Sequence, residues 1–81
     1  MSDSMRLQNR TAIVTGAASG IGRGIAVALA GRGCHLALAD INQEGLAETA
    51  FSASVARERS SSGSMRIIVR GPRLLHVRLR V

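Results

Sequence analysis

Residues 11–50 alternate between short apolar runs and longer segments with one apolar face, and this pattern predicts strands and helices in turn. The run TAIVT at residues 11–15 is rich in β-branched residues and stops at Gly16, which is typical of a buried parallel strand. A helix is predicted from about residue 20 to residue 30. Its apolar positions recur at helical spacing and form one stripe: Ile21, Ile25, Ala28 and Leu29.

A second strand and a second helix are predicted farther along the chain. CHLALAD, residues 34–40, is another apolar run and closes at Asp40, and Asn42 can cap the helix that follows. A right-handed crossover between the two strands places them side by side and parallel. We expect both strands to be buried on both faces, in an α/β fold.

The loop between the first strand and the first helix, TGAASGIG, has the composition of an anion-binding turn. The first N–H groups of a helix lack partners, and the positive end of the helix dipole lies behind them. Glycines at 16, 20 and 22 remove side chains where the chain turns tightly, where a phosphate approaches and where the helix packs on the strand. Three glycines alone equally fit close packing in another α/β protein. The flanking strand and helix favour a dinucleotide site.

Asp40 ends the next strand, where a carboxylate can accept hydrogen bonds from both ribose hydroxyls of an adenosine. An exposed strand-end acid or a helix cap is the alternative interpretation, and the glycine loop favours the ribose. The negative charge would repel a 2′-phosphate.

TGAASGIG together with LALADIN resembles the N-terminal segment of the short-chain dehydrogenase/reductase family, from about Leu7 to Ala50. The resemblance implies a partial Rossmann fold, the first βαβα of a doubly wound parallel sheet. It also implies NAD(P)-dependent hydride transfer between an alcohol and a carbonyl. Asp40, followed by Ile41, and the absence of a basic residue at position 19 imply NAD rather than NADP. The implied cofactor-binding residues are Thr15, Gly16, Ser19, Gly20, Ile21, Gly22 and Asp40.

The residues that perform the family's chemistry have no counterpart in this chain. The resemblance implies a general acid/base tyrosine, a lysine four residues later, a serine and an asparagine. The sequence contains no tyrosine and no lysine, and it lacks an Asn-Asn-Ala-Gly turn. Cys34 and His35 have no partners spaced as metal ligands or as a catalytic group. We therefore assign no catalytic residue and no metal ligand, and we expect a truncated dehydrogenase that is inactive alone.

Charge divides the chain into two segments. Residues 1–50 are neutral overall, whereas residues 51–81 hold seven arginines and one acid, so the net charge of +6 lies there. We predict an N-terminal dinucleotide-binding segment at 1–50, with its second helix extending up to about residue 57. A basic Ser/Arg-rich tail at 58–81 is expected to be irregular or to form a weak β-hairpin. Our leading hypothesis for this tail is a reading-frame shift near Phe51.

Three function classes remain open at this point: a truncated dehydrogenase, a nucleotide-binding fragment without chemistry, and a basic interaction peptide. The peptide would contact nucleic acid or anionic surfaces without specificity, because the chain has no aromatic platform for stacking bases. The expected partners are NAD(H) and, for the full-length parent only, an alcohol or carbonyl substrate. A single cysteine and the lack of a long apolar run predict a cytoplasmic protein without a membrane partner. Open sheet edges leave self-association as a further expectation.

Overall fold

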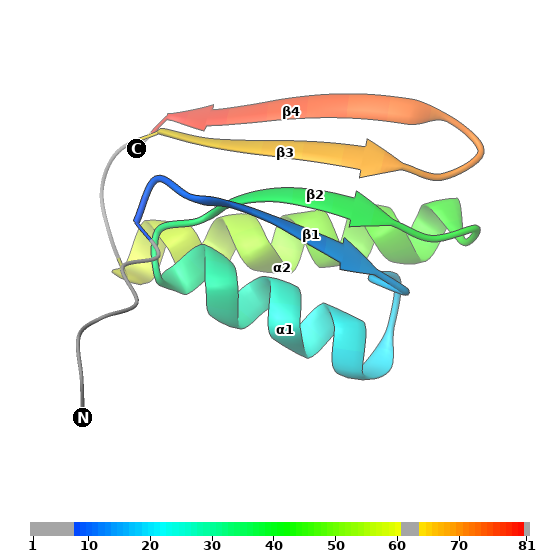
Figure 1. Ribbon diagram of the computed structural model, residues 1–81, viewed down its shortest axis with the longest axis horizontal. Coiled ribbons are helices and arrows are strands. Elements are labelled where there is room, and N and C mark those ends of the chain that lie inside the picture. The colour runs from blue at the N-terminus through cyan, green and yellow to red at the C-terminus, as the bar shows by residue number, and fades with distance from the viewer. Residues whose placement is uncertain (1–7, 61–63, 81) are drawn as a thin grey trace.

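The computed structural model describes residues 8–60 and 64–80, with side chains described for 8–59 and 64–73. Two strand–helix pairs are followed by a hairpin in one four-stranded sheet, in the order β1-β2-β3-β4 (Figure 1). β2 pairs in parallel with both β1 and β3, and β4 pairs with β3 in antiparallel orientation. The three parallel strands and two crossover helices confirm the predicted α/β, partial Rossmann fold. The elements are β1 (Thr11–Thr15), α1 (Gly20–Gly31), β2 (His35–Ala39), α2 (Gln43–Ser60), β3 (Ser64–Arg70) and β4 (Leu74–Arg80).

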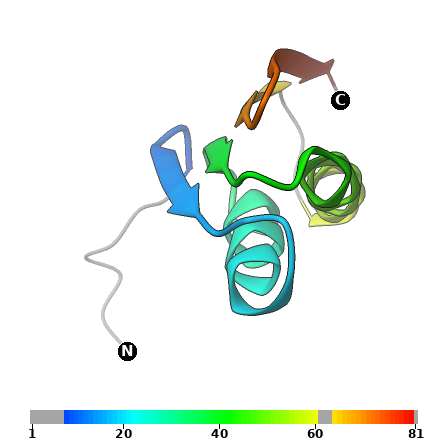
Figure 2. The same cartoon turned by 90° about the vertical axis from the view of Figure 1, so that its right-hand side faces the viewer.

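Both helices lie on the same face of the sheet, and the expectation that the strands are buried on both faces is therefore wrong (Figure 2). Side chains of a strand point alternately to the two faces, so Val14 in β1 is buried under the helices while Ile13 is 77% exposed. The register places Ile13, Ala37 and Ile68 in one row across the uncovered side, which we call the open face. The apolar runs predicted that both faces of the sheet would be covered, whereas both crossover helices lie on the same face and leave the other uncovered.

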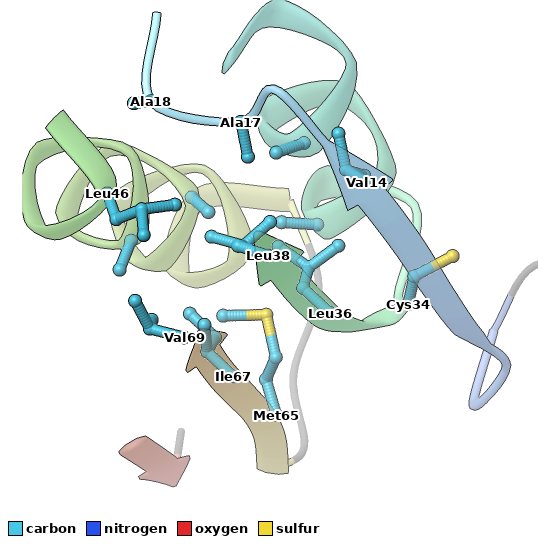
Figure 3. Packing of buried hydrophobic residues seen from close by; sticks show 14 residues of the cluster. Val14, Ala17, Ala18, Cys34, Leu36, Leu38, Leu46, Met65, Ile67 and Val69 are labelled. Carbon is cyan, nitrogen blue, oxygen red and sulfur yellow. The ribbon is translucent and has the colours of Figure 1, made fainter. Parts of the chain in front are cut away.

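The core lies between the sheet and the two helices (Figure 3). β2 contributes Leu36 and Leu38, and β3 contributes three buried residues that pack toward α2, namely Met65, Ile67 and Val69. The stripe predicted as the apolar face of α1 faces this core only in part: Leu29 packs against it, whereas Ile21 is 83% exposed and the fully buried residues of α1 are Ala26 and Ala30. Small side chains occupy the contact because α1 packs closely against its neighbours.

The segment after residue 57 continues the same sheet. α2 extends to Ser60, and β3 and β4 form the hairpin foreseen as one alternative for the tail, with β3 docked on β2. Arg57, in the last turn of α2, is 1% exposed and donates hydrogen bonds to the carbonyl oxygens of Cys34 (3.3 Å) and Ser64 (3.0 Å). Its guanidinium thus joins α2 to the residue before β2 and to the first residue of β3. The division of the chain at residue 58 stays a prediction.

Candidate functional site

The loop between β1 and α1 turns through two glycines in the left-handed region of backbone space. Gly16 has a φ of 64° and Gly20 a φ of 60°. A side chain at such a position costs about 1 kcal/mol or more, which explains glycine there. Gly22 is required for a different reason, because a Cβ at this position would lie 2.1 Å from the carbonyl oxygen of Gly16. The loop therefore folds back closely on the first turn of α1.

Side chains from both helices hold the carbonyl groups of this loop. Thr49 in α2 is fully buried, and its hydroxyl donates to the carbonyl oxygen of Ala17 at 2.6 Å. Arg23 in α1 donates from Nη2 to the carbonyl oxygen of Ala18 and from Nε to Thr49 Oγ1, the latter at 2.9 Å. The same Nη2 reaches the carbonyl oxygen of Gly45 at 3.2 Å. The loop is thus fixed from the side that faces α2.

Asp40 fixes the loop from the side of the sheet. The backbone N–H of Ala18 donates to its Oδ2 at 3.0 Å, and those of Ile41 and Asn42 donate to Oδ1 at 2.6 and 3.2 Å. These hydrogen bonds, first that from Ala18, hold the pKa of the Asp40 carboxyl below its ordinary value. The group is therefore ionised at neutral pH. A carboxylate has about four acceptor positions, so one remains after three are used.

The lowered pKa of Asp40 predicts that the fold loses stability in acid. Ionised Asp40 contributes stability at pH values above the pKa of the unfolded chain, and this contribution is lost as the pH falls through the lower pKa of the folded state. We expect Asp40→Asn to have a lower melting temperature than the wild type at neutral pH, with the gap closing in acid. Thermal unfolding followed by circular dichroism over this range measures the gap. Glu58→Gln, at an exposed acid, is the control and should keep the wild-type profile; a gap that persists in acid contradicts the prediction.

An open pocket of about 600 Å³ lies at the carboxyl ends of β1, β2 and β3. Three of the predicted site residues line it, namely Thr15, Gly16 and Asp40, together with Arg70 at the end of β3. In open α/β sheets, ligands bind outside the carboxyl ends of the strands, which is the position of this pocket. The pocket thus joins the start of the glycine loop to the acid at the end of β2.

The other predicted site residues lie at the first turn of α1. Ser19 is the N-cap residue and has extended backbone angles, with no hydrogen bond from its side chain to the helix. Gly20, Ile21 and Gly22 form the turn itself, and the Ile21 side chain points into solvent. Their unpaired backbone N–H groups, rather than their side chains, are what this turn offers to an anion.

Four residues around the site were missed or misjudged from the sequence. Arg23 was not assigned to the site, yet its guanidinium donates hydrogen bonds to both the loop and α2. Thr49 was not singled out, and Gly45 was not recognised as a close contact, although a Cβ there would lie 2.7 Å from Ala18 Cβ. Arg70 was treated as part of the tail. The glycine within the predicted second helix was the one available signal.

Within residues 8–60 and 64–80, no three His, Cys, Asp or Glu side chains gather as metal ligands. Burial raises the pKa of the Cys34 thiol, which opposes formation of the reactive thiolate. None of the described helices is long and apolar enough to cross a membrane.

Comparison with known proteins finds a matching family model and similar sequences. Residues 10–65 match the family model for short chain dehydrogenases, so the match extends beyond Ala50 into β3. The sorbitol dehydrogenase of Cereibacter sphaeroides is 50% identical over 46 residues, 57% of this chain and 18% of its own. The NADP-dependent dehydrogenase M3 of a Phoma species is 55% identical over 40 residues, 49% of this chain and 12% of its own.

Solved structures agree with the fold. The L-sorbose reductase of Gluconobacter frateurii, determined with NADPH and L-sorbose, superposes with a TM-score of 0.64 and 29% identity. The superposition covers 83% of this chain and 24% of that protein. The chain thus spans no more than about a quarter of the length of these three proteins.

Proposed function

Because the chain belongs to the short chain dehydrogenase family, we propose that its folded unit binds the adenosine diphosphate half of NAD. The pyrophosphate lies against the turn that carries Ser19, Gly20, Ile21 and Gly22, and Asp40 accepts a hydrogen bond from the adenosine ribose. One observation carries the proposal: the N–H of Ala18 donates to Asp40, so the ribose acceptor and the phosphate loop form a single rigid unit. Thr15 and Gly16 complete the wall between them.

NAD is the preferred cofactor in this proposal, because the ionised Asp40 repels a 2′-phosphate. The chain alone transfers no hydride, since its sequence supplies no tyrosine or lysine for the proton transfer that accompanies that step. For a full-length protein built on this unit, we propose oxidation of an alcohol or reduction of a carbonyl with NAD(H). The chain itself is then a truncated, cytoplasmic member of the family with a nucleotide site and no catalytic residue.

The charge of Asp40 is tested by comparing two cofactors. We expect Asp40→Ala to weaken NAD binding about tenfold, because a hydrogen bond to an ionised acceptor is roughly twice as strong as one between neutral groups. NADP should lose less or gain, because the repulsion of its 2′-phosphate disappears together with the acceptor. Isothermal titration calorimetry with both cofactors gives the ratio of their dissociation constants.

The ratio separates cofactor recognition from damage to the loop. Loss of the Ala18–Asp40 hydrogen bond alone would weaken both cofactors by the same factor and leave the ratio unchanged, which would count against the ribose role. Glu58→Ala, at an exposed acid in the last turns of α2, is the control and should alter neither constant. Absence of wild-type binding even at millimolar NAD would reject the proposed function as a whole.

A further inference from the structure

The Arg23 side chain lies where α1, the glycine loop and α2 meet. Its Nε donates to Thr49 Oγ1, and its Nη2 is within hydrogen-bond distance of three acceptors: the carbonyl oxygens of Ala18 and Gly45 and Glu48 Oε1, the last at 3.1 Å. The side chain is 33% exposed, whereas that of Glu48 is 71% exposed. These contacts direct the planar fork of the guanidinium toward the loop and α2.

The consequence for the loop follows from the geometry of a trans peptide, in which the C=O and the N–H of one plane point in opposite directions. The described backbone contains no cis peptide bond. Thr49 holds the carbonyl of Ala17, and the N–H of the same plane, which belongs to Ala18, is bonded to Asp40. Arg23 holds the carbonyl of Ala18, and the N–H of that plane belongs to Ser19.

We propose that Arg23 is a positioning residue for phosphate binding: it holds the Ala18 carbonyl toward α2 and thereby aims the Ser19 N–H out of the loop at the pyrophosphate. This role rests on the proposed function. In this role Arg23 acts through the backbone, because its Nε and Nη2 donors are bonded to protein oxygens. Thr49 supports it by accepting from Nε while donating to Ala17.

A lysine cannot take over this role. Arginine presents several N–H donors in one plane at fixed angles, whereas lysine carries a single ammonium on a flexible stem. The Nε and Nη2 donors reach Thr49 and Ala18 together only because they belong to one rigid group. Lysine and arginine place the same positive charge near the amino end of α1. A comparison of the wild type with Arg23→Lys therefore separates positioning of the loop from simple electrostatic attraction of the phosphate.

The experiment compares ADP with adenosine, because only ADP carries the group that the loop holds. Both ligands are titrated by NMR into the wild type and into Arg23→Gln, Arg23→Lys and Arg32→Gln. Arg32 follows α1 and is exposed, so the same substitution there is the matched control. We expect Arg23→Gln to lower ADP affinity about tenfold and leave adenosine affinity unchanged, since small misplacements of a binding group have effects of this size or larger. Arg23→Lys should not restore ADP affinity, and Arg32→Gln should match the wild type.

Three results would overturn the proposal while the proposed function stands: equal losses for ADP and adenosine, unchanged ADP affinity in Arg23→Gln, or rescue by lysine. A wild type that binds neither ADP nor NAD removes the proposed function, and the role of Arg23 falls with it. If Arg23→Gln does not fold, Thr49→Val and Thr49→Ser give the same comparison. The valine variant should lose ADP affinity selectively, whereas the serine variant, which keeps the hydroxyl, should not; equal ADP affinity in these two variants overturns the proposal.

Discussion

Gly22→Ala is expected to abolish NAD binding and to lower the free energy of unfolding by about 3 kcal/mol. The added Cβ would stand 2.1 Å from the Gly16 carbonyl oxygen and 2.8 Å from its carbonyl carbon, so the loop backbone itself has to move. Overpacking against atoms that cannot rotate away typically costs about 1–3 kcal/mol, and backbone contacts lie at the upper end. Movement of Gly16 also displaces the wall of the pocket beside Asp40.

Gly24→Ala is the matched control for this prediction. Gly24 lies two residues farther along α1, and a Cβ there meets no heavy atom within 4 Å. In an exposed helix, exchange of glycine for alanine stabilises by about 0.5–1 kcal/mol. Urea unfolding of both variants and calorimetry with NAD give the comparison. Similar stability of the two variants, or NAD binding by Gly22→Ala, would show that the loop is not closed as the structure has it.

Arg57→Ala is expected to lower the free energy of unfolding by about 2–4 kcal/mol. The substitution removes the largest fully buried side chain among residues 8–59 and 64–73, and it removes one donor each from the carbonyl oxygens of Cys34 and Ser64. A hydrogen bond to a charged group contributes about 1.5–3 kcal/mol, and the cavity left in the core adds to its loss. The structure should be loosened most at the start of β3, because Arg57 joins that end of the hairpin to α2.

Two further variants test the reason for this effect. Arg57→Met keeps much of the volume and removes a buried charge whose Nε has no hydrogen-bond partner, so it should cost less than alanine. Arg59→Ala, at an exposed arginine of the same helix turn, should change stability by no more than about 0.5 kcal/mol. Urea unfolding supplies all three values. An effect of Arg57→Ala equal to that of Arg59→Ala would contradict the anchoring role.

The order of the elements and the parallel pairing of the first two strands were predictable, because both follow from local apolar patterns and one handedness rule. The side of α1 that faces the core was not. Ile21 and Ile25 form the more hydrophobic stripe, yet Ala26 and Ala30 are buried, because a close helix contact selects small side chains. Hydrophobicity ranks side chains by transfer free energy and contains no information on the space available to them.

The candidate site was predictable to the same extent. The glycine spacing and the acid that closes β2 are local signals, and the structure places Thr15, Gly16 and Asp40 on one pocket. Their binding roles stay predictions. Arg23 and Thr49 could not be assigned, because 26 positions separate two side chains that meet only after α2 has packed on α1. The pairing of β3 with β2 depends likewise on a crossover through the whole of α2.

If a second copy of the chain covers the row of Ile13, Ala37 and Ile68 on the open face, the stability of this chain depends on its concentration as well as on its sequence. Any molecule, including a second copy, that binds this face in the folded chain but not in the unfolded one raises the free energy of unfolding in proportion to the logarithm of its concentration. A melting temperature measured at one protein concentration then includes the contribution of association. Only its limiting value on dilution reports the stability of the isolated fold.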